Sequence, residues 1–212
     1  MQIRTLAELI DVPHPAWLEI AVAITNAPVP VEVVAITHQG AALYSLQVTV
    51  GSALGALAYN CGGLVIDHGW VRLLGGGSDD LPSLAAANNL GEPETVKGPP
   101  PYLTIGFDVL GGHFAIDGGG LGFTPGEVCY FAPDLLEWES TGLGHGAFVQ
   151  AFLGGVTTNF YKSLRWPGWE QEVSQLKLDQ GIALWPPPST EQGKDLSKVT
   201  RQAVPFSELL NL

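Results

Sequence analysis

Two short apolar runs bounded by glycine constrain the fold of this chain more than any other feature of its sequence. Residues 64–66 (LVI) and 70–74 (WVRLL) are separated only by Asp67-His68-Gly69, and glycines stand outside them at 62–63 and 75–77. Short apolar runs between turn residues are typical of strands, and glycine readily adopts the backbone conformations that end a helix or turn the chain. The sequence therefore predicts a hairpin of two buried strands, and with it a sheet.

The same reasoning along the chain predicts the fold class. β-branched and apolar runs indicate strands near 31–36, 63–67, 69–74, 102–109, 113–117 and 127–132, and residues 134–139 are a candidate edge strand. We expect one α+β domain over residues 1–190, with a mainly antiparallel sheet of about five or six strands and helices packed chiefly on one face. Residues 191–212 are expected to form a C-terminal extension, with VPFSELL as a candidate docking helix.

Helical segments are expected where apolar residues recur every three or four positions. They cover residues 5–10, 16–26 and 40–50, a helix capped by Ser52, and residues 146–164, in which the glycine pair 154–155 weakens the helix and favours a kink. The apolar content of 16–26 predicts that this helix is buried. One core is expected to contain Val65, Ile66, Trp70, Leu73, Ile105, Phe107, Phe114 and Phe152.

Charge and hydropathy limit the classes of partner. Nine Lys and Arg against 21 Asp and Glu give a net charge of −12, and residues 73–161 carry ten acidic residues against Lys97 alone. Such a surface repels nucleic-acid phosphates and attracts cationic proteins. We expect no direct nucleic-acid ligand, although an acidic composition also serves solubility alone. The longest apolar stretch is too short to span a membrane and no signal-like run opens the chain, so we expect a cytoplasmic protein without membrane insertion.

Acidic residues in two polar segments are the candidate binding residues. The segment 78–101 has few large apolar residues, and Asp79 and Asp80 open it; Trp138 stands between Glu137 and Glu139. Carboxylates are seldom buried without partners, and an aromatic ring among charges is common at protein interfaces. We expect Asp79, Asp80, Glu137, Trp138 and Glu139 to face a basic protein partner, with half-buried packing as the alternative for the tryptophan.

A catalytic interpretation rests on four other residues. Cys61, His68, His113 and Asp117 would form a thiol-hydrolase-like site if paired strands brought them together, although no local motif fixes that geometry. The cysteines otherwise behave as small hydrophobic residues, and no disulfide between Cys61 and Cys129 is expected. The histidine spacing lacks a metal-binding pattern, and the glycine runs match no phosphate-binding motif, so neither a metal nor a cofactor is expected.

Several segments also resemble a known family. The run from 54 to 77, together with GFDVLGGHFAIDGGGLG, GEVCYFAPDLLEWE and YKSLRWPGWEQEV, resembles the bacterial domain of unknown function 2625 family, over about residues 1–190. The glycine-bounded strand pair is more distantly similar to the SUKH superfamily, which includes immunity proteins that neutralise nuclease toxins. The resemblance implies no catalytic residues. We therefore expect a non-enzymatic binding protein of the immunity type, with an enzyme that uses a Cys/His/Asp pocket as the alternative.

Overall fold

The computed structural model describes residues 3–93 and 98–209. Its strands are β1 (Val31–Val34), β2 (Gly63–Ile66), β3 (Val71–Leu74), β4 (Tyr102–Asp108), β5 (His113–Asp117), β6 (Glu127–Phe131), β7 (Trp138–Gly144), β8 (Gln180–Trp185) and β9 (Thr200–Pro205). Its helices are α1 (Leu6–Ile10), α2 (Trp17–Thr25), α3 (Ala41–Leu46), α4 (Ala53–Asn60), α5 (Leu84–Ala87), α6 (His145–Leu153), α7 (Thr157–Phe160), η2 (Lys162–Leu164), α8 (Trp169–Val173), η3 (Glu191–Gly193) and α9 (Phe206–Leu209).

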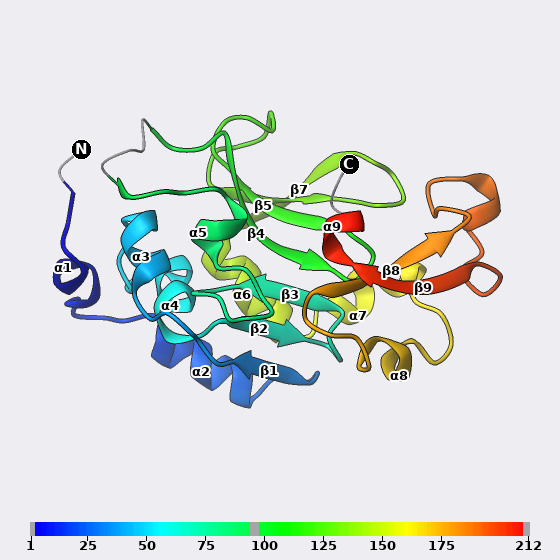
Figure 1. Ribbon diagram of the computed structural model, residues 1–212, viewed down its shortest axis with the longest axis horizontal. Coiled ribbons are helices and arrows are strands. Elements are labelled where there is room, and N and C mark those ends of the chain that lie inside the picture. The colour runs from blue at the N-terminus through cyan, green and yellow to red at the C-terminus, as the bar shows by residue number, and fades with distance from the viewer. Residues whose placement is uncertain (1–2, 94–97, 210–212) are drawn as a thin grey trace.

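Seven strands form one sheet in chain order, from β1 at one edge to β7 at the other, and each pair is antiparallel (Figure 1). The mixed α+β, antiparallel architecture is as predicted, but the sheet is larger than the expected five or six strands. Its last strand lies at Trp138–Gly144 instead of 134–139, and β8 and β9 pair separately as a second, two-stranded sheet. The expected hairpin is present, with Leu64 opposite Leu73 and Ile66 opposite Val71.

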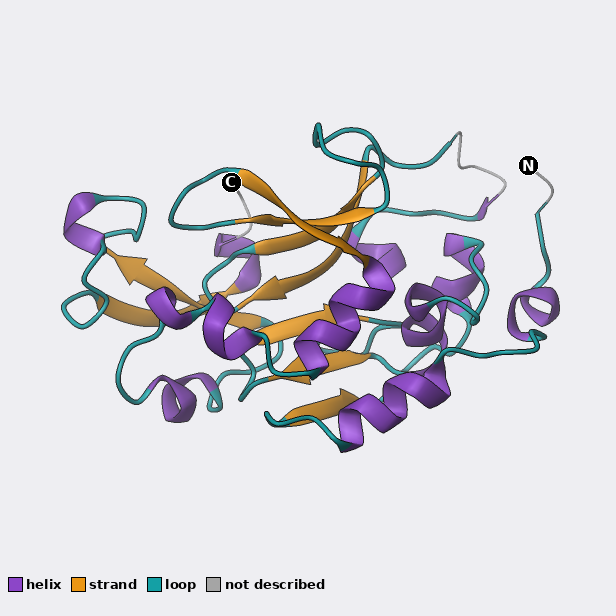
Figure 2. Cartoon of the chain, turned by 180° about the vertical axis from the view of Figure 1, so that it is seen from behind, coloured by secondary structure: helices purple, strands orange, loops and turns teal. Residues whose placement is uncertain are grey.

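One face of the main sheet packs against helices that carry aromatic side chains. Phe148 and Phe152 of α6 contact Phe114 of β5, with ring centroids 5.1 and 5.2 Å away. Figure 2 shows α6 crossing in front of the sheet on this side. The helix expected over 146–164 is broken rather than kinked: α6 ends before Gly154, and Gly155 takes a positive φ of 85° that leads to α7. Glycine adopts a positive φ more readily than residues that carry a side chain, so Gly155 is suited to the break between α6 and α7.

The opposite face is covered by the C-terminal segment. Hairpin β8–β9 is followed by α9, whose Phe206 packs on Phe107 of β4 with ring centroids 5.8 Å apart. Within the VPFSELL segment, residues Phe206–Leu209 form α9. Residues 191–209 therefore contribute a strand and a helix to the cover of the main sheet.

The core prediction is confirmed at all eight positions, since each residue lies in one hydrophobic cluster and Phe114 and Phe152 are 0% and 2% exposed. The predicted burial of the helix at 16–26 is wrong. In α2 only Ile20 is buried, whereas Leu18 and Val22 are 70% and 61% exposed. Within the described ranges, no helix combines the length and hydrophobicity needed to cross a membrane.

Candidate functional site

The acidic candidate residues are exposed but lie in two separate places. Asp79 and Asp80 follow β3, and Glu137 and Glu139 flank the start of β7. The strands β4, β5 and β6 lie between β3 and β7 in the sheet. Trp138 is half-buried, with its ring against Tyr102 and Phe131.

The four catalytic candidates are not brought together. Cys61 and His68 lie at opposite ends of β2, and His113 and Asp117 are the first and last residues of β5, about 13 Å apart along the strand. Burial raises the pKa of the Cys61 thiol to about 12, which keeps it protonated at neutral pH. Burial acts to raise the pKa of Asp117, but hydrogen bonds from the backbone N–H groups of Leu121, Gly119 and Phe123 outweigh it and lower that pKa. This carboxylate therefore organises the glycine-rich loop.

The turn between β2 and β3 separates its aspartate from its histidine. Asp67, His68 and Gly69 all have positive φ angles, of 57°, 59° and 92°. Asp67 is buried and accepts hydrogen bonds from Thr157 Oγ1 at 2.6 Å and Arg165 Nη2 at 2.5 Å. His68 is exposed, with its ring on the edge of Trp169 at 5.7 Å. Asp67 is a structural partner of Arg165, and His68 is left at the surface.

A buried arginine is the most unusual residue of the sheet. Side chains alternate between the two faces of a strand. In β3, Val71 and Leu73 therefore face α6 and α7, and Arg72 faces the C-terminal segment. Because β3 is an interior strand and both faces are covered, Arg72 is only 1% exposed. Burial lowers the pKa of its guanidinium to about 10, and the charges of Asp108 and Asp179 oppose that shift in part.

The described residues provide this guanidinium with almost no hydrogen-bond partners. Its Nη2 donates to the backbone oxygen of Lys177 at a long 3.4 Å, and its Nε and Nη1 are buried without a partner among residues 3–93 and 98–209. Within the described ranges, no carboxylate oxygen lies within 4.0 Å of its nitrogens. The ring of Phe206 lies 4.9 Å from its central carbon. A buried charge without hydrogen-bonding partners is costly and calls for an explanation.

Arg165 shows how the same fold satisfies a buried guanidinium. It forms an ion pair with Asp67, and the ring of Trp169 lies 3.9 Å from its central carbon. Its Nε also lacks a hydrogen-bond partner among the described residues, but the Asp67 carboxylate balances its positive charge. Among the residues that the structure describes, Arg72 has no carboxylate partner equivalent to Asp67. Both arginines contact an aromatic ring, but only Arg165 also has an ion pair, which is the stronger of these two contacts.

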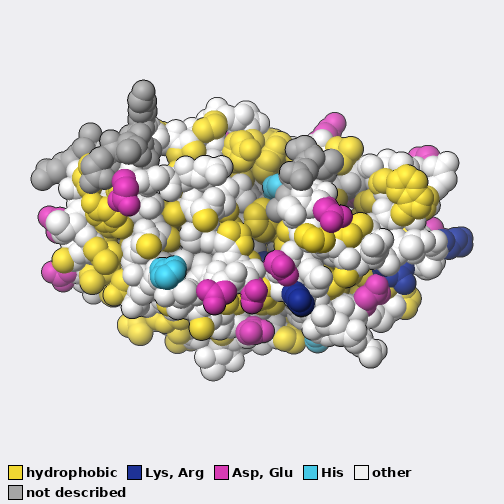
Figure 3. Space-filling view, in the orientation of Figure 1, with side chains coloured by type: hydrophobic (Ala, Val, Ile, Leu, Met, Phe, Trp, Pro, Cys, Tyr) yellow, Lys and Arg dark blue, Asp and Glu magenta, His cyan; other side chains and the backbone are white. Residues whose placement is uncertain are grey.

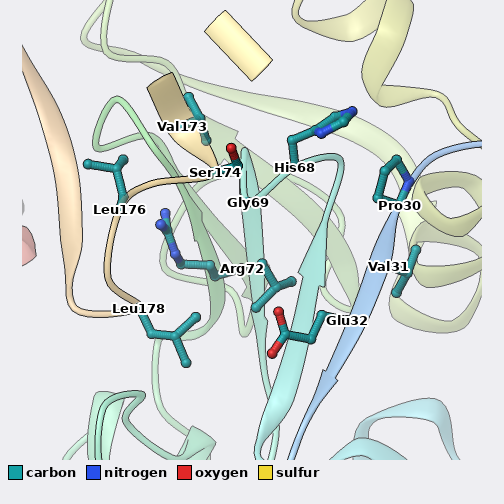
Figure 4. Close-up of a pocket in the computed structure, with 11 residues that line it drawn as sticks. Pro30, Val31, Glu32, His68, Gly69, Arg72, Val173, Ser174, Leu176 and Leu178 are labelled. Atoms are coloured by element: carbon teal, nitrogen blue, oxygen red, sulfur yellow. The ribbon is translucent and has the colours of Figure 1, made fainter. Parts of the chain in front are cut away.

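Arg72 lines a cavity of about 330 Å³, which is within the size range of small-molecule sites. The cavity lies between the β1–β3 end of the sheet and the segment that follows α8 (Figure 4). Leu176 and Leu178 lie beside the guanidinium, Glu32 and Val65 form the sheet side, and His68 lies at the turn with its ring directed away from Arg72. The lining is thus mainly aliphatic, with one cationic and one anionic side chain.

The arrangement is suited to binding an anionic group. The unpaired Nε and Nη1 donors of the guanidinium match the two oxygens of a carboxylate or phosphate. Because these nitrogens are buried, a ligand in the cavity contacts them only after the side chain or its aliphatic cover shifts. No group of three or more His, Cys, Asp and Glu side chains able to hold a metal ion occurs in the part of the chain that the structure describes.

Sequence reasoning did not select Arg72 as a site residue, because its apolar neighbours indicated a buried strand and nothing more. The useful signal was the arginine itself: it interrupts the apolar run WVRLL, and arginine is rarely fully buried unless paired. The second wall of the cavity comes from residues 173–178, which contain none of the candidate site residues expected from the sequence.

Comparison with known proteins assigns the family. Residues 6–209 match the model of the family described as protein of unknown function DUF2625. The chain belongs to this family. It is 33% identical over 186 residues to an uncharacterized protein of Haemophilus influenzae, covering 86% of this chain and 82% of the relative.

A second relative gives the same picture. The chain is 36% identical over 190 residues to the uncharacterized protein YbfG of Escherichia coli K12, covering 86% of this chain and 84% of that protein. No solved structure matches the chain. The resemblance to DUF2625 expected from the sequence is confirmed, and the comparisons give no support to the SUKH likeness.

Proposed function

We propose that this DUF2625 protein binds a small ligand that carries a carboxylate or phosphate group, and that Arg72 recognises this group. The observation that carries the proposal is the Arg72 guanidinium, which is buried at the wall of a cavity with its Nε and Nη1 unpaired. A bound anion would accept hydrogen bonds from Nε and Nη1, for which the described residues provide no acceptor, and would add a direct ion pair to the more distant charges of Asp108 and Asp179. We do not propose catalysis, because Cys61, His68, His113 and Asp117 are not assembled into a site.

Hexanoate and hexyl phosphate are suitable probes, since each joins an anionic group to an aliphatic chain that matches the cavity wall. Titration followed by ¹H–¹⁵N NMR should give a Kd near the millimolar range, which corresponds to about −4 kcal/mol. The Arg72→Met variant should weaken binding at least about 10-fold, because hydrogen bonds to charged groups contribute about 1.5–3 kcal/mol.

Lys177→Met is the matched control. Lys177 is exposed and contacts Arg72 only through its backbone oxygen, so this variant removes a nearby positive charge without changing the guanidinium. It should bind the probes within about 2-fold of the original protein, since exposed charges are screened. If both variants bind equally well, or if neither probe binds the original protein, the proposal is wrong.

A second candidate function is the docking of a basic protein, as an immunity-type inhibitor would do. The observation in its favour is that Asp79, Asp80, Glu137 and Glu139 are all exposed. The two pairs lie beside different strands of the sheet, so each pair is tested separately. Trp138 stands between Glu137 and Glu139 in the sequence, and the exposed part of its half-buried ring would supply an aromatic contact.

This candidate is tested with a partner captured from cells that express the protein. Replacing Asp79 and Asp80, or Glu137 and Glu139, by their amides should slow association chiefly at low salt, because electrostatic steering is screened by ions. Association rates that do not change for either double variant would remove the electrostatic argument.

A further inference from the structure

The cavity contains a negative side chain as well as Arg72. Glu32 of β1 is paired in register with Val65 of β2, which is paired with Arg72 of β3. The three residues therefore share one face of the sheet, and Glu32 and Arg72 are two strand spacings, or about 10 Å, apart at the backbone. All three line the same cavity.

The two charged groups do not neutralise each other. Within the described part of the chain, the ion pairs of 4.0 Å or less include neither Glu32 nor Arg72. Figure 4 shows the Arg72 guanidinium extending toward Leu176, away from the Glu32 carboxylate, and by register Val65 lies between the two strand positions. An aliphatic surface therefore separates an anionic from a cationic group.

The charge of the surrounding face favours a ligand without net negative charge. The protein has a net charge of −12, and Asp and Glu side chains gather on the face seen in Figure 3 over β1–β3 and the segment before β8. A purely anionic ligand would be repelled on approach to this face, whereas a molecule with one positive and one negative end would not.

We propose that the ligand is zwitterionic, with a carboxylate bound by Arg72, an ammonium group bound by Glu32, and an aliphatic chain between them against Val65, Leu176 and Leu178. This inference rests on the proposed function, because it requires anion binding at Arg72, and it adds the second charged group and its spacing. The chemical class is an ω-amino carboxylate or a molecule that presents the same two ends.

The test compares 6-aminohexanoate, hexanoate and hexylamine at low salt by NMR titration of the full chain. 6-Aminohexanoate should bind about 5-fold more tightly than hexanoate, the upper range for a partly exposed ion pair, and hexylamine should bind more weakly than both. In Glu32→Gln this preference should disappear, leaving 6-aminohexanoate and hexanoate with equal affinity. Glu139→Gln, which removes an exposed acid at the other edge of the sheet, should keep the preference.

Chain length provides a further test, because the two charges are held apart by Val65. 4-Aminobutanoate and glycine should bind progressively less well than 6-aminohexanoate. Equal affinities for hexanoate and 6-aminohexanoate, both lost in Arg72→Met, would overturn this inference and leave anion binding at Arg72 in place. A preference that survives in Glu32→Gln would overturn the role of Glu32, and the absence of binding by every probe would overturn both proposals.

Discussion

At the scale of single residues, two buried arginines differ in how their positive charge is compensated. Arg165 has Asp67 as its ion-pair partner, whereas the described residues give Arg72 a long contact to a backbone oxygen and the ring of Phe206. The simplest alternative to a ligand is that Asp179, whose charge acts on Arg72 from the segment before β8, serves as its partner after a small rotation.

The Asp179→Asn variant separates these explanations. If Arg72 depends on a ligand and not on Asp179, the variant should lose less than about 0.5 kcal/mol of stability, as exposed substitutions usually do. Breaking a buried ion pair instead costs about 3–5 kcal/mol. Urea unfolding of the variant and of the original protein gives the difference, and a loss in that larger range would show that Asp179 is the partner.

A second residue predicts a pH dependence. Burial lowers the pKa of His145, at the start of α6, to about 4, and its Nδ1 has no hydrogen-bond partner. Between pH about 4 and about 6.5 the unfolded chain binds a proton at this residue that the folded protein does not, so stability rises with pH over this window and falls on acidification.

The His145→Gln variant should therefore lose less stability than the original protein when the pH is lowered from about 6.5 to about 4. Part of the dependence should remain, because burial also lowers the pKa of His113. Urea unfolding across this range measures the effect, with the exposed His38→Gln as the matched control. Parallel pH profiles for His145→Gln and the original protein would contradict this account of His145.

At the scale of elements, the C-terminal strand and helix complete the cover of the main sheet. β9 is the partner of β8 throughout its length, and Phe206 of α9 covers both Phe107 and Arg72. A chain that ends at Thr190 loses β9 and α9. Since truncating one buried Phe to Ala costs about 3–5 kcal/mol, we expect this shortened chain to lose cooperative unfolding, as measured by calorimetry. Retention of the original unfolding transition would mean that residues 1–190 form an independent domain.

The sequence identified the elements that have a strong local pattern. The β2–β3 hairpin, the strands around Phe107 and Phe114, and the cap of α4 by Ser52 all follow from apolar runs, glycines and a capping side chain. β7 (WESTGLG) and β8 (QGIALW) carry polar residues and glycine, so local propensity does not identify them as strands, and pairing with β6 and β9 fixes them instead.

The candidate site was less accessible to sequence reasoning than the fold. Its walls come from β1, β2, β3 and the segment after α8, and only the register of the sheet brings Glu32 and Arg72 to one face. The exposure of the acidic residues was predictable from composition, but their separation depends on the order of the strands.

At the scale of the whole molecule, Arg72 is expected to reduce global stability. Replacing buried charged groups with apolar side chains of similar volume is often neutral, or stabilising by about 1–4 kcal/mol. Arg72→Met should therefore unfold at the same or a higher urea concentration than the original protein while it loses ligand binding. A loss of several kcal/mol would mean that the guanidinium is a structural group.

The most direct measurement concerns the Nε–H group of Arg72. The chain has only four arginines, Arg4, Arg72, Arg165 and Arg201, so their side-chain Nε–H signals can be resolved by ¹H–¹⁵N NMR, and Arg72→Met identifies the one of interest. If Arg72 binds the anionic end of a ligand, saturation with 6-aminohexanoate should shift this signal strongly and slow its hydrogen exchange, because an unpaired donor gains a partner. An Arg72 signal that stays unchanged at saturating 6-aminohexanoate would contradict the account.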